Sequence, residues 1–262
     1  MFAKLNNTNV CYNIYGKETE YTLIFIHGYP LDQSMWSPQL ELSTQTRIIT
    51  YDIRGFGKTE SGTSEYSIEL FAEDLIALIH YLKIKKPILC GFSMGGYIAL
   101  NAASKLADGL NGLILHDTQC QADSEETQKQ RYDSIDAIKI NGVTGYATNF
   151  LTKMIAAASF NNTELVTWLK STMQKNSASQ LTNTLRCLAE RKDTCIQSED
   201  FKFPILIIRG ESDEIINEEK TLFMLSKMPH AKYIKLENAG HLSNMENARE
   251  FNKSLTDFIM AL

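Results

Sequence analysis

Short apolar runs rich in β-branched residues alternate with helical patterns along the chain, and this alternation limits its fold more than any other feature. The helical pattern is clearest at Ser67–Leu82, where apolar residues recur at the helical period, Ser67 is a suitable N-cap and Glu69 lies in the first turn. Further helices are predicted at Gly95–Leu106, Glu218–Met228 and Ala248–Ala261, and strands at Val10–Tyr15, Thr22–Ile26, Arg47–Tyr51, Pro87–Cys90, Leu113–His116, Ile205–Arg209 and Tyr233–Leu236. Alternating strands and helices predict an α/β fold, in which helices flank a mostly parallel sheet and ligands bind outside the carboxyl ends of the strands.

Residues 118–200 break this alternation. The segment opens with the polar stretch QCQADSEETQKQR and continues with helical candidates at Tyr146–Phe160, Thr163–Met173 and Ala178–Glu190. It contains none of the short apolar runs that predict strands. We therefore expect a helical insertion, residues 118–200, between two strands of a core made by residues 1–117 and 201–262.

Composition excludes several classes of protein. With 44% hydrophobic and 22% charged residues, the chain is expected to be globular and not disordered. Its net charge of −5 and the lack of a basic run argue against a nucleic-acid partner. No apolar run approaches the ~20 residues that cross a bilayer, so no membrane partner is expected. The sequence leaves open whether the chain forms a homo-oligomer.

The five cysteines indicate a compartment. Five is an odd number, and no two of the cysteines form a C-x-x-C pair. We expect buried free thiols in a reducing compartment. Because the first residues also lack the apolar core of a signal peptide, the sequence predicts a cytoplasmic protein.

The segment Gly91-Phe92-Ser93-Met94-Gly95 is the strongest chemical signal. It matches the pattern G-x-S-x-G between a predicted strand and a predicted helix, where the turn is so tight that the serine takes a strained backbone conformation. Gly91 and Gly95 supply the room that this turn needs. The pattern predicts that Ser93 is a nucleophile at the edge of the sheet, although a glycine-rich turn without catalysis is the alternative.

A serine hydroxyl needs a base to take its proton. Among the five histidines, His241 is the best candidate, because it lies in a loop between the last predicted strand and the last predicted helix. His116 is its only rival, since it ends a predicted strand. The histidines do not share the spacing of metal ligands, so no metal is expected.

The base in turn needs a carboxylate that orients it and stabilises the imidazolium. Asp213 follows a predicted strand directly and would reach the same edge of the sheet as Ser93 and His241. The alternatives are nearby Glu211 and Glu214 and the more distant Asp117.

Two amides are candidates for an oxyanion hole. The Met94 N–H lies at a predicted helix N-terminus, and the Tyr29 N–H lies in the loop His27-Gly28-Tyr29-Pro30 after a strand. We expect His27 to be buried and structural under this loop. Trp36, Phe92 and Met245 are candidates for substrate binding beside these motifs, although packing in the core is an alternative for all three.

Together these motifs resemble the α/β-hydrolase superfamily over nearly the whole chain, and within it small bacterial carboxylesterases, cofactor-free haloperoxidases (perhydrolases) and 3-oxoadipate enol-lactonases. The similar segments are HGYPLDQSMW, YDIRGFGKTE, GFSMGGYIAL, DTQCQADSEETQKQR, GESDEI and NAGHLSNMENAREFN. The order Ser93, Asp213, His241 along the chain is the order of the catalytic triad in this fold. The resemblance also implies oxyanion donors at Tyr29 and Met94, and a cap at residues 118–200.

We therefore predict a serine hydrolase that cleaves a small carboxylic ester through an acyl-enzyme, a carboxylesterase-like reaction without a cofactor. The alternatives within the fold are opening of a lactone, C–C bond hydrolysis and perhydrolysis. A non-catalytic signalling protein with a hydrolase fold is the alternative outside enzymology, and an intact triad argues against it.

Overall fold

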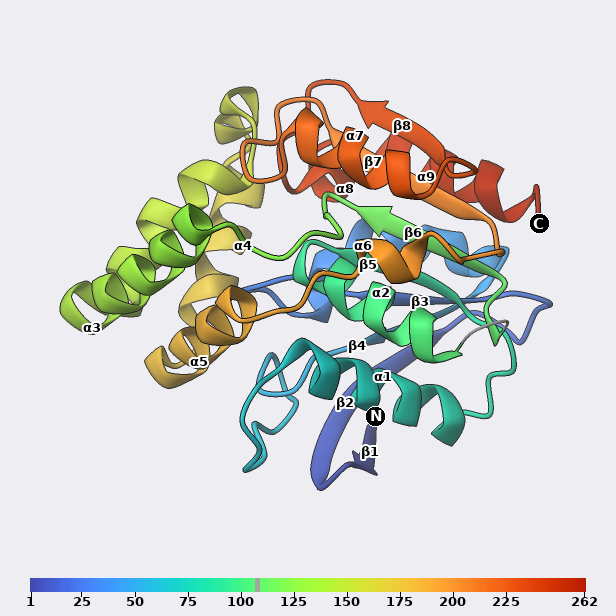
Figure 1. The fold of residues 1–262 in the computed structure, drawn as a ribbon, viewed down its shortest axis with the longest axis horizontal. Coiled ribbons are helices and arrows are strands. Elements are labelled where there is room, and N and C mark those ends of the chain that lie inside the picture. The colour runs from blue at the N-terminus through green and yellow to red at the C-terminus, as the bar shows by residue number, and fades with distance from the viewer. Residues whose placement is uncertain (107–108) are drawn as a thin grey trace.

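An eight-stranded sheet forms the centre of the computed structural model, which describes residues 1–106 and 109–262 (Figure 1). The strand order is β1-β2-β4-β3-β5-β6-β7-β8. The strands are β1 (Phe2–Leu5), β2 (Thr8–Tyr15), β3 (Thr22–Ile26), β4 (Arg47–Tyr51), β5 (Ile88–Phe92), β6 (Gly112–His116), β7 (Ile205–Gly210) and β8 (Lys232–Leu236). Strands β3 to β8 pair in parallel, whereas β1 and β2 extend the sheet antiparallel at one edge. The mostly parallel α/β sheet predicted from the sequence is confirmed.

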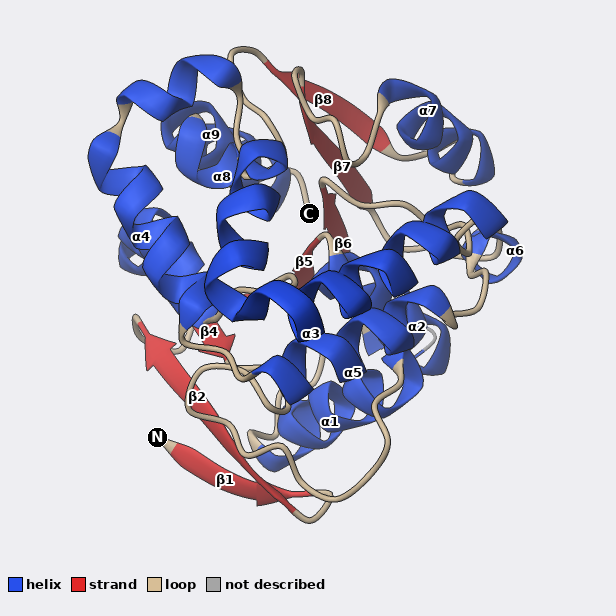
Figure 2. Cartoon of the chain, turned by 90° about the vertical axis from the view of Figure 1, so that its left-hand side faces the viewer, coloured by secondary structure: helices blue, strands red, loops and turns tan. Residues whose placement is uncertain are grey.

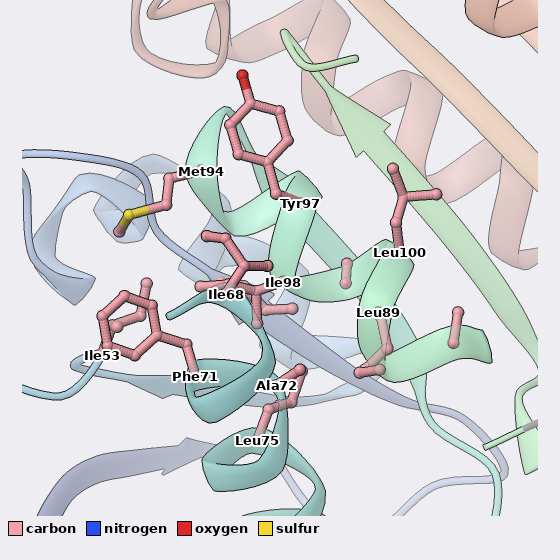
Figure 3. Packing of buried hydrophobic residues seen from close by; sticks show 14 of the residues in the cluster. Ile53, Ile68, Phe71, Ala72, Leu75, Leu89, Met94, Tyr97, Ile98 and Leu100 are labelled. Carbon is pink, nitrogen blue, oxygen red and sulfur yellow. The ribbon is translucent and has the colours of Figure 1, made fainter. Parts of the chain in front are cut away.

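Helices cover both faces of this sheet. The core helices are α1 (Ile68–Tyr81), α2 (Met94–Leu106), α7 (Glu218–Lys227), α8 (Ser243–Glu246) and α9 (Ala248–Ile259), together with the 3-10 segment η1 (Gln33–Thr44). Ser67 caps α1 as predicted, because its side chain accepts a hydrogen bond from the Leu70 amide. Figure 3 shows Phe71 and Leu75 of α1 packed beside Ile98 of α2 on one face.

Alternate residues of each parallel strand enter different layers. In β3, Ile24 belongs to the cluster with α1 and α2, whereas Leu23 and Phe25 belong to the cluster with η1 and α9. This alternation is the period of two of an extended strand. The central strands β3, β5 and β6 are buried throughout because both of their faces are covered, and they are therefore mostly apolar.

The helical insertion follows β6 and precedes β7. It contains α3 (Glu125–Met154), the 3-10 segment η3 (Ala157–Asn161), α4 (Thr163–Gln174), α5 (Ala178–Ala189) and the short α6 (Cys195–Ser198). Figure 2 views the molecule from the side that α3, α4 and α5 cover. The helix predicted at Tyr146–Phe160 is wrong in its extent, because α3 begins much earlier, is broken at Gly142 with φ +69°, and ends at Met154.

A disulfide joins the two ends of this insertion. Cys120 and Cys195, separated by 75 residues, are bonded, whereas Cys11, Cys90 and Cys187 are buried and free. The prediction of five free thiols is therefore wrong. The two partners meet only because β6 and β7 are neighbours in the sheet, and sequence spacing does not reveal that contact. Since disulfides persist in oxidising compartments, the cysteines no longer support a reducing one.

Among the described residues, no helix has the combination of length and apolar character that crossing a bilayer requires.

Candidate active site

Ser93 lies in the turn between β5 and α2 and has a left-handed backbone with φ +50°. Such a conformation is strained for a residue with a side chain. The flanking glycines make the turn possible, because a Cβ at Gly91 would lie 2.3 Å from the Gly95 carbonyl oxygen, and one at Gly95 would lie 2.2 Å from that of Ile26. The predicted turn is therefore present, and the half-buried Ser93 side chain lies at the carboxyl end of β5.

The structure brings the three predicted triad side chains together. His241 Nε2 lies 3.0 Å from Ser93 Oγ, and His241 Nδ1 lies 2.8 Å from Asp213 Oδ2. Asp213 is buried, and its other carboxylate oxygen accepts hydrogen bonds from the Ile215 and Ile216 amides. A neutral imidazole that donates from Nδ1 to Asp213 leaves Nε2 free to accept the proton of the Ser93 hydroxyl.

The electrostatics of this pair favour the imidazolium. Burial of His241 opposes its charged form, but the Asp213 carboxylate and its hydrogen bond, together with the Asp117 and Glu246 charges, more than offset burial and raise the pKa of His241 above its usual 6.5. The arrangement can therefore store a proton on His241 while the serine reacts.

Two glycines bring the acid loop and the base loop into direct contact. A Cβ at Gly210, which ends β7, would lie 2.0 Å from the carbonyl oxygen of Gly240, the residue before His241. The Ser212 amide also donates to the Ala239 carbonyl at 2.8 Å. The spacing of Asp213 and His241 is therefore set by backbone packing between two loops.

The rival residues His116 and Asp117 form a separate buried cluster with Ser243. His116 Nε2 lies 2.8 Å from Ser243 Oγ and 2.7 Å from Asp117 Oδ2, and Ser243 Oγ donates to Asp117 Oδ2 at 2.7 Å. Asp117 also accepts the Gly210 amide at 2.7 Å. Burial and the nearby Asp213 charge raise the pKa of Asp117 well above its usual range. The structure thus places His116 and Asp117 behind the triad, as a brace for both loops.

Sequence reasoning also missed Glu246. Its carboxylate accepts the amides of Gly240 at 2.9 Å and Ala156 at 2.7 Å, and the Ser159 hydroxyl at 2.6 Å. It therefore connects the base loop to the helical insertion. The sequence signals this role only through the position of Glu246, five residues after His241.

The candidate oxyanion loop lies over Phe92. A Cβ at Gly28 would lie 2.7 Å from the Phe92 ring, and His27 is buried with its Nε2 accepting the Ile53 amide at 2.9 Å. Tyr29 follows in this loop, and Met94 begins α2, where the first amides have no partner inside the helix.

The three predicted substrate-binding residues pack in or against the core. Trp36 is fully buried and stacks on Phe25 with ring centroids 4.4 Å apart. Phe92 is also fully buried, and its ring centroid lies 4.9 Å from that of His241. Met245 is partly buried against the cluster of η1 and α9. In this structure Trp36 and Phe92 pack inside the core, where a substrate has no access.

A cavity of about 340 Å³ lies between the helical insertion and the core. It is bounded by the loops after β3, β6 and β7 and by α2, α3, α5 and α7. Its lining residues include Tyr29, Asp123, Arg131, Tyr146, Phe150 and Lys220. Within the described part of the chain, no group of three or more His, Cys, Asp or Glu side chains is arranged to hold a metal.

Comparison with sequence families gives one clear match. The sequence model of the family described as "Alpha/beta hydrolase family" matches residues 23–254 of this chain. That span contains all the motifs from the Gly28 loop to His241.

Individual relatives cover most or all of the chain. The chain is 24% identical over 264 residues to 3-oxoadipate enol-lactonase 1 of Acinetobacter baylyi, covering 100% of this chain and 97% of that protein. It is 27% identical to a putative non-heme chloroperoxidase of Synechocystis, with 90% of each chain covered.

Solved structures agree. A thermophilic esterase from Thermogutta terrifontis, determined with malate bound, superimposes with a TM-score of 0.91 at 28% identity, covering 97% of this chain and 94% of that one. The enol-lactonase from Burkholderia xenovorans gives a TM-score of 0.92 at 25% identity, covering 99% and 100%.

Proposed function

This chain belongs to the α/β-hydrolase family, and we propose that it is a serine hydrolase that cleaves small carboxylic esters with Ser93, His241 and Asp213. The observation that carries the proposal is the continuous chain of hydrogen-bonding distances from Ser93 Oγ through the His241 ring to Asp213. This series of contacts starts at Ser93, in a strained turn directly before the first amides of α2.

In the first step, Ser93 Oγ attacks the ester carbonyl while His241 Nε2 takes the hydroxyl proton. Asp213 stabilises the resulting imidazolium. The Met94 and Tyr29 amides are the proposed donors to the tetrahedral oxyanion, and each such donor is worth about 3 kcal/mol in the transition state. The imidazolium then protonates the leaving alkoxide, and an acyl-enzyme on Ser93 results.

In the second step, His241 Nε2 takes a proton from water while the water oxygen attacks the acyl carbonyl. The bond between the acyl carbon and Ser93 Oγ then breaks, the imidazolium returns its proton to Ser93 Oγ, and the acid product departs. We propose that residues 118–200 act as a cap over this site, because Tyr29 of the candidate oxyanion loop lines the cavity between those helices and the core, although Ser93 and His241 do not.

Lactone opening is the second candidate. Two relatives named as enol-lactonases cover this chain from end to end, at 24% and 25% identity. A lactone is a cyclic ester, so the same steps apply, except that the leaving alkoxide stays attached to the acyl group.

The test compares p-nitrophenyl acetate and butyrate hydrolysis by the wild type, Ser93→Ala and Ser104→Ala. Ser104 is the matched control, because it is an exposed serine farther along α2. Ser93→Ala is expected to lower kcat/KM at least ~10³-fold, since triad members act as a unit. Ser104→Ala should retain full activity.

A fluorophosphonate probe separates an enzyme from a non-catalytic protein of the same fold. We expect one adduct, mapped to Ser93 by peptide mass spectrometry. Equal hydrolysis by Ser93→Ala, or no adduct at Ser93, would contradict the proposal.

A further inference from the structure

The cavity between the helical insertion and the core contains a buried hydroxyl that the proposed chemistry does not use. The Tyr29 side chain is 5% exposed and lines this cavity, and its hydroxyl has no hydrogen-bond partner among the described residues. A buried hydroxyl without a partner costs free energy, about 1–3 kcal/mol on mutational evidence. The cavity therefore presents a hydrogen-bond donor that a ligand could satisfy.

Two cationic side chains that are not fully exposed, Arg131 and Lys220, line this cavity. Arg131 and Arg191 both pair with the same carboxylate, that of Asp123, whose side chain is fully buried. Lys220, half-buried in the same lining, donates only to the Ile215 carbonyl at 3.2 Å among the residues that the structure describes. Arg191 does not line the cavity but shares the Asp123 carboxylate with Arg131, so the part of the lining shielded from solvent holds two cations and one carboxylate.

Other charged groups lie at the rim. Glu126, Glu214 and Lys153 also line the cavity, but all three are exposed to solvent. Solvent screens exposed charges strongly and buried ones much less. The interior therefore keeps a net positive character in spite of the two exposed glutamates.

Arg131 is close enough to act on the hydroxyls. Burial raises the pKa of Tyr29 well above its usual range and that of Tyr146 to about 12, and the Arg131 charge opposes both shifts. The Tyr29 and Tyr146 rings have centroids 6.5 Å apart. The side chain of Arg131 is 20% exposed and lines the cavity.

The remaining walls are partly apolar, beside the polar side chains of Gln119, Thr127, Gln130 and Ser134. Phe150 stacks on Tyr146 with ring centroids 5.5 Å apart, and Leu185, Ile215 and Ile216 also line the cavity. A short methylene chain can pack against the apolar side chains, whereas a bare inorganic anion would make no apolar contact with them. The combined lining suits a ligand with an apolar stem and an anionic end.

We propose that this cavity binds the free carboxylate of an acidic ester or lactone, with Arg131 and the Tyr29 hydroxyl as its donors and Lys220 adding charge. The inference rests on the proposed function, because the Tyr29 amide is the proposed oxyanion donor while its side chain reaches the cavity. Tyr29 would therefore contact the reacting carbonyl through its amide and the carboxylate through its hydroxyl. Arg131 already donates Nε and Nη2 to the two carboxylate oxygens of Asp123, so its remaining N–H groups are the proposed donors to the ligand. A lysine has no planar fork that could serve two carboxylates in this way.

The test uses pairs of substrates that differ only in charge. Monoethyl succinate, glutarate and adipate are each compared with the ester in which a carboxamide replaces the free acid. The wild type should show a kcat/KM at least about tenfold higher for the best acid than for its amide, as expected for one charge-assisted interaction. Equal kcat/KM values for every pair would overturn the inference.

Variants assign the preference to the cavity. Arg131→Gln should reduce the acid-to-amide ratio to about one, mainly through KM, and Arg131→Lys should restore part of it. Lys129→Gln is the matched control, because it removes one exposed cation from the same helix and should leave the ratio at its wild-type value. A wild-type ratio in Arg131→Gln would overturn the assignment.

A variant-free measurement covers the case in which Arg131→Gln does not fold. Glutarate should compete with p-nitrophenyl acetate in the wild type, and glutaramide should not; equal inhibition by both would overturn the inference. The two hypotheses fail differently. Ser93-dependent hydrolysis without a preference for acids defeats only the carboxylate site, whereas the lack of any Ser93-dependent hydrolysis defeats the proposed function.

Discussion

The disulfide at the base of the helical insertion leads to a quantitative prediction. Cys120 follows β6 and Cys195 precedes β7, so the bond closes a loop that contains α3, α4 and α5. For the 75-residue separation, the chain-entropy relation gives about 4.5 kcal/mol of stabilisation at 25 °C. With an unfolding entropy of about 2.1 cal/mol/K for each of the 262 residues, this corresponds to a melting shift of about 8 °C.

The assay is thermal unfolding of the wild type with and without a phosphine reductant, followed by circular dichroism. Alkylation and intact-mass measurement establish how many thiols are free in each sample. The double variant Cys120→Ala/Cys195→Ala is the control, because it retains the free Cys11, Cys90 and Cys187 and should not respond to the reductant. A shift below about 2 °C in fully reduced wild type would refute the reasoning from loop closure.

Three further predictions concern the site. Because His241 must be neutral to accept a proton and its pKa is raised, kcat/KM should fall as the pH drops through a midpoint above 6.5, and Asp213→Asn should move that midpoint to lower pH. In p-nitrophenyl ester assays, Asp213→Asn should lower kcat about 10⁴-fold. Asp117→Asn should lower kcat less than about tenfold, because Asp117 only supports the two loops. A larger loss of kcat in Asp117→Asn than in Asp213→Asn would make Asp117 the acid of the triad. Gly95→Ala should lower the free energy of unfolding in urea by at least about 3 kcal/mol, since the new Cβ would lie 2.2 Å from the Ile26 carbonyl oxygen, and a wild-type urea midpoint would contradict this.

Much of the fold could be predicted because its main signals are local. The strands Thr22–Ile26 and Arg47–Tyr51 have the predicted bounds, since both are short apolar runs covered on both faces. The edge strand Phe2–Leu5 was missed, because only its alternate residues are buried and its apolar pattern is therefore weak. Helix α3 was placed too late for a related reason: most of its surface is polar, and its N-terminal cap at Ser124 lies inside a stretch that resembles a loop.

Some features of the candidate site could likewise be predicted from local signals, whereas others could not. Ser93, Asp213 and His241 could be found from their positions after strands, because parallel strands bring their carboxyl ends to one edge of the sheet. The direction in which a side chain packs could not be predicted from its position after a strand. Trp36 is near the motifs in sequence, but its ring points into the core against Phe25. The cluster of His116, Asp117 and Ser243 depends on a contact between β6 and the segment after His241, and no local pattern encodes such a contact.

The close approach of Gly210 to Gly240 has a consequence for how this enzyme could diversify. Their contact is between main chains, so no side chain there can be exchanged to alter the spacing of Asp213 and His241. The cavity, in contrast, is lined by many side chains of α3. Substitutions in that helix, by selection or by design, could therefore change the range of substrates while the geometry of proton transfer stays constant. Substrate preference and catalytic chemistry would then evolve separately.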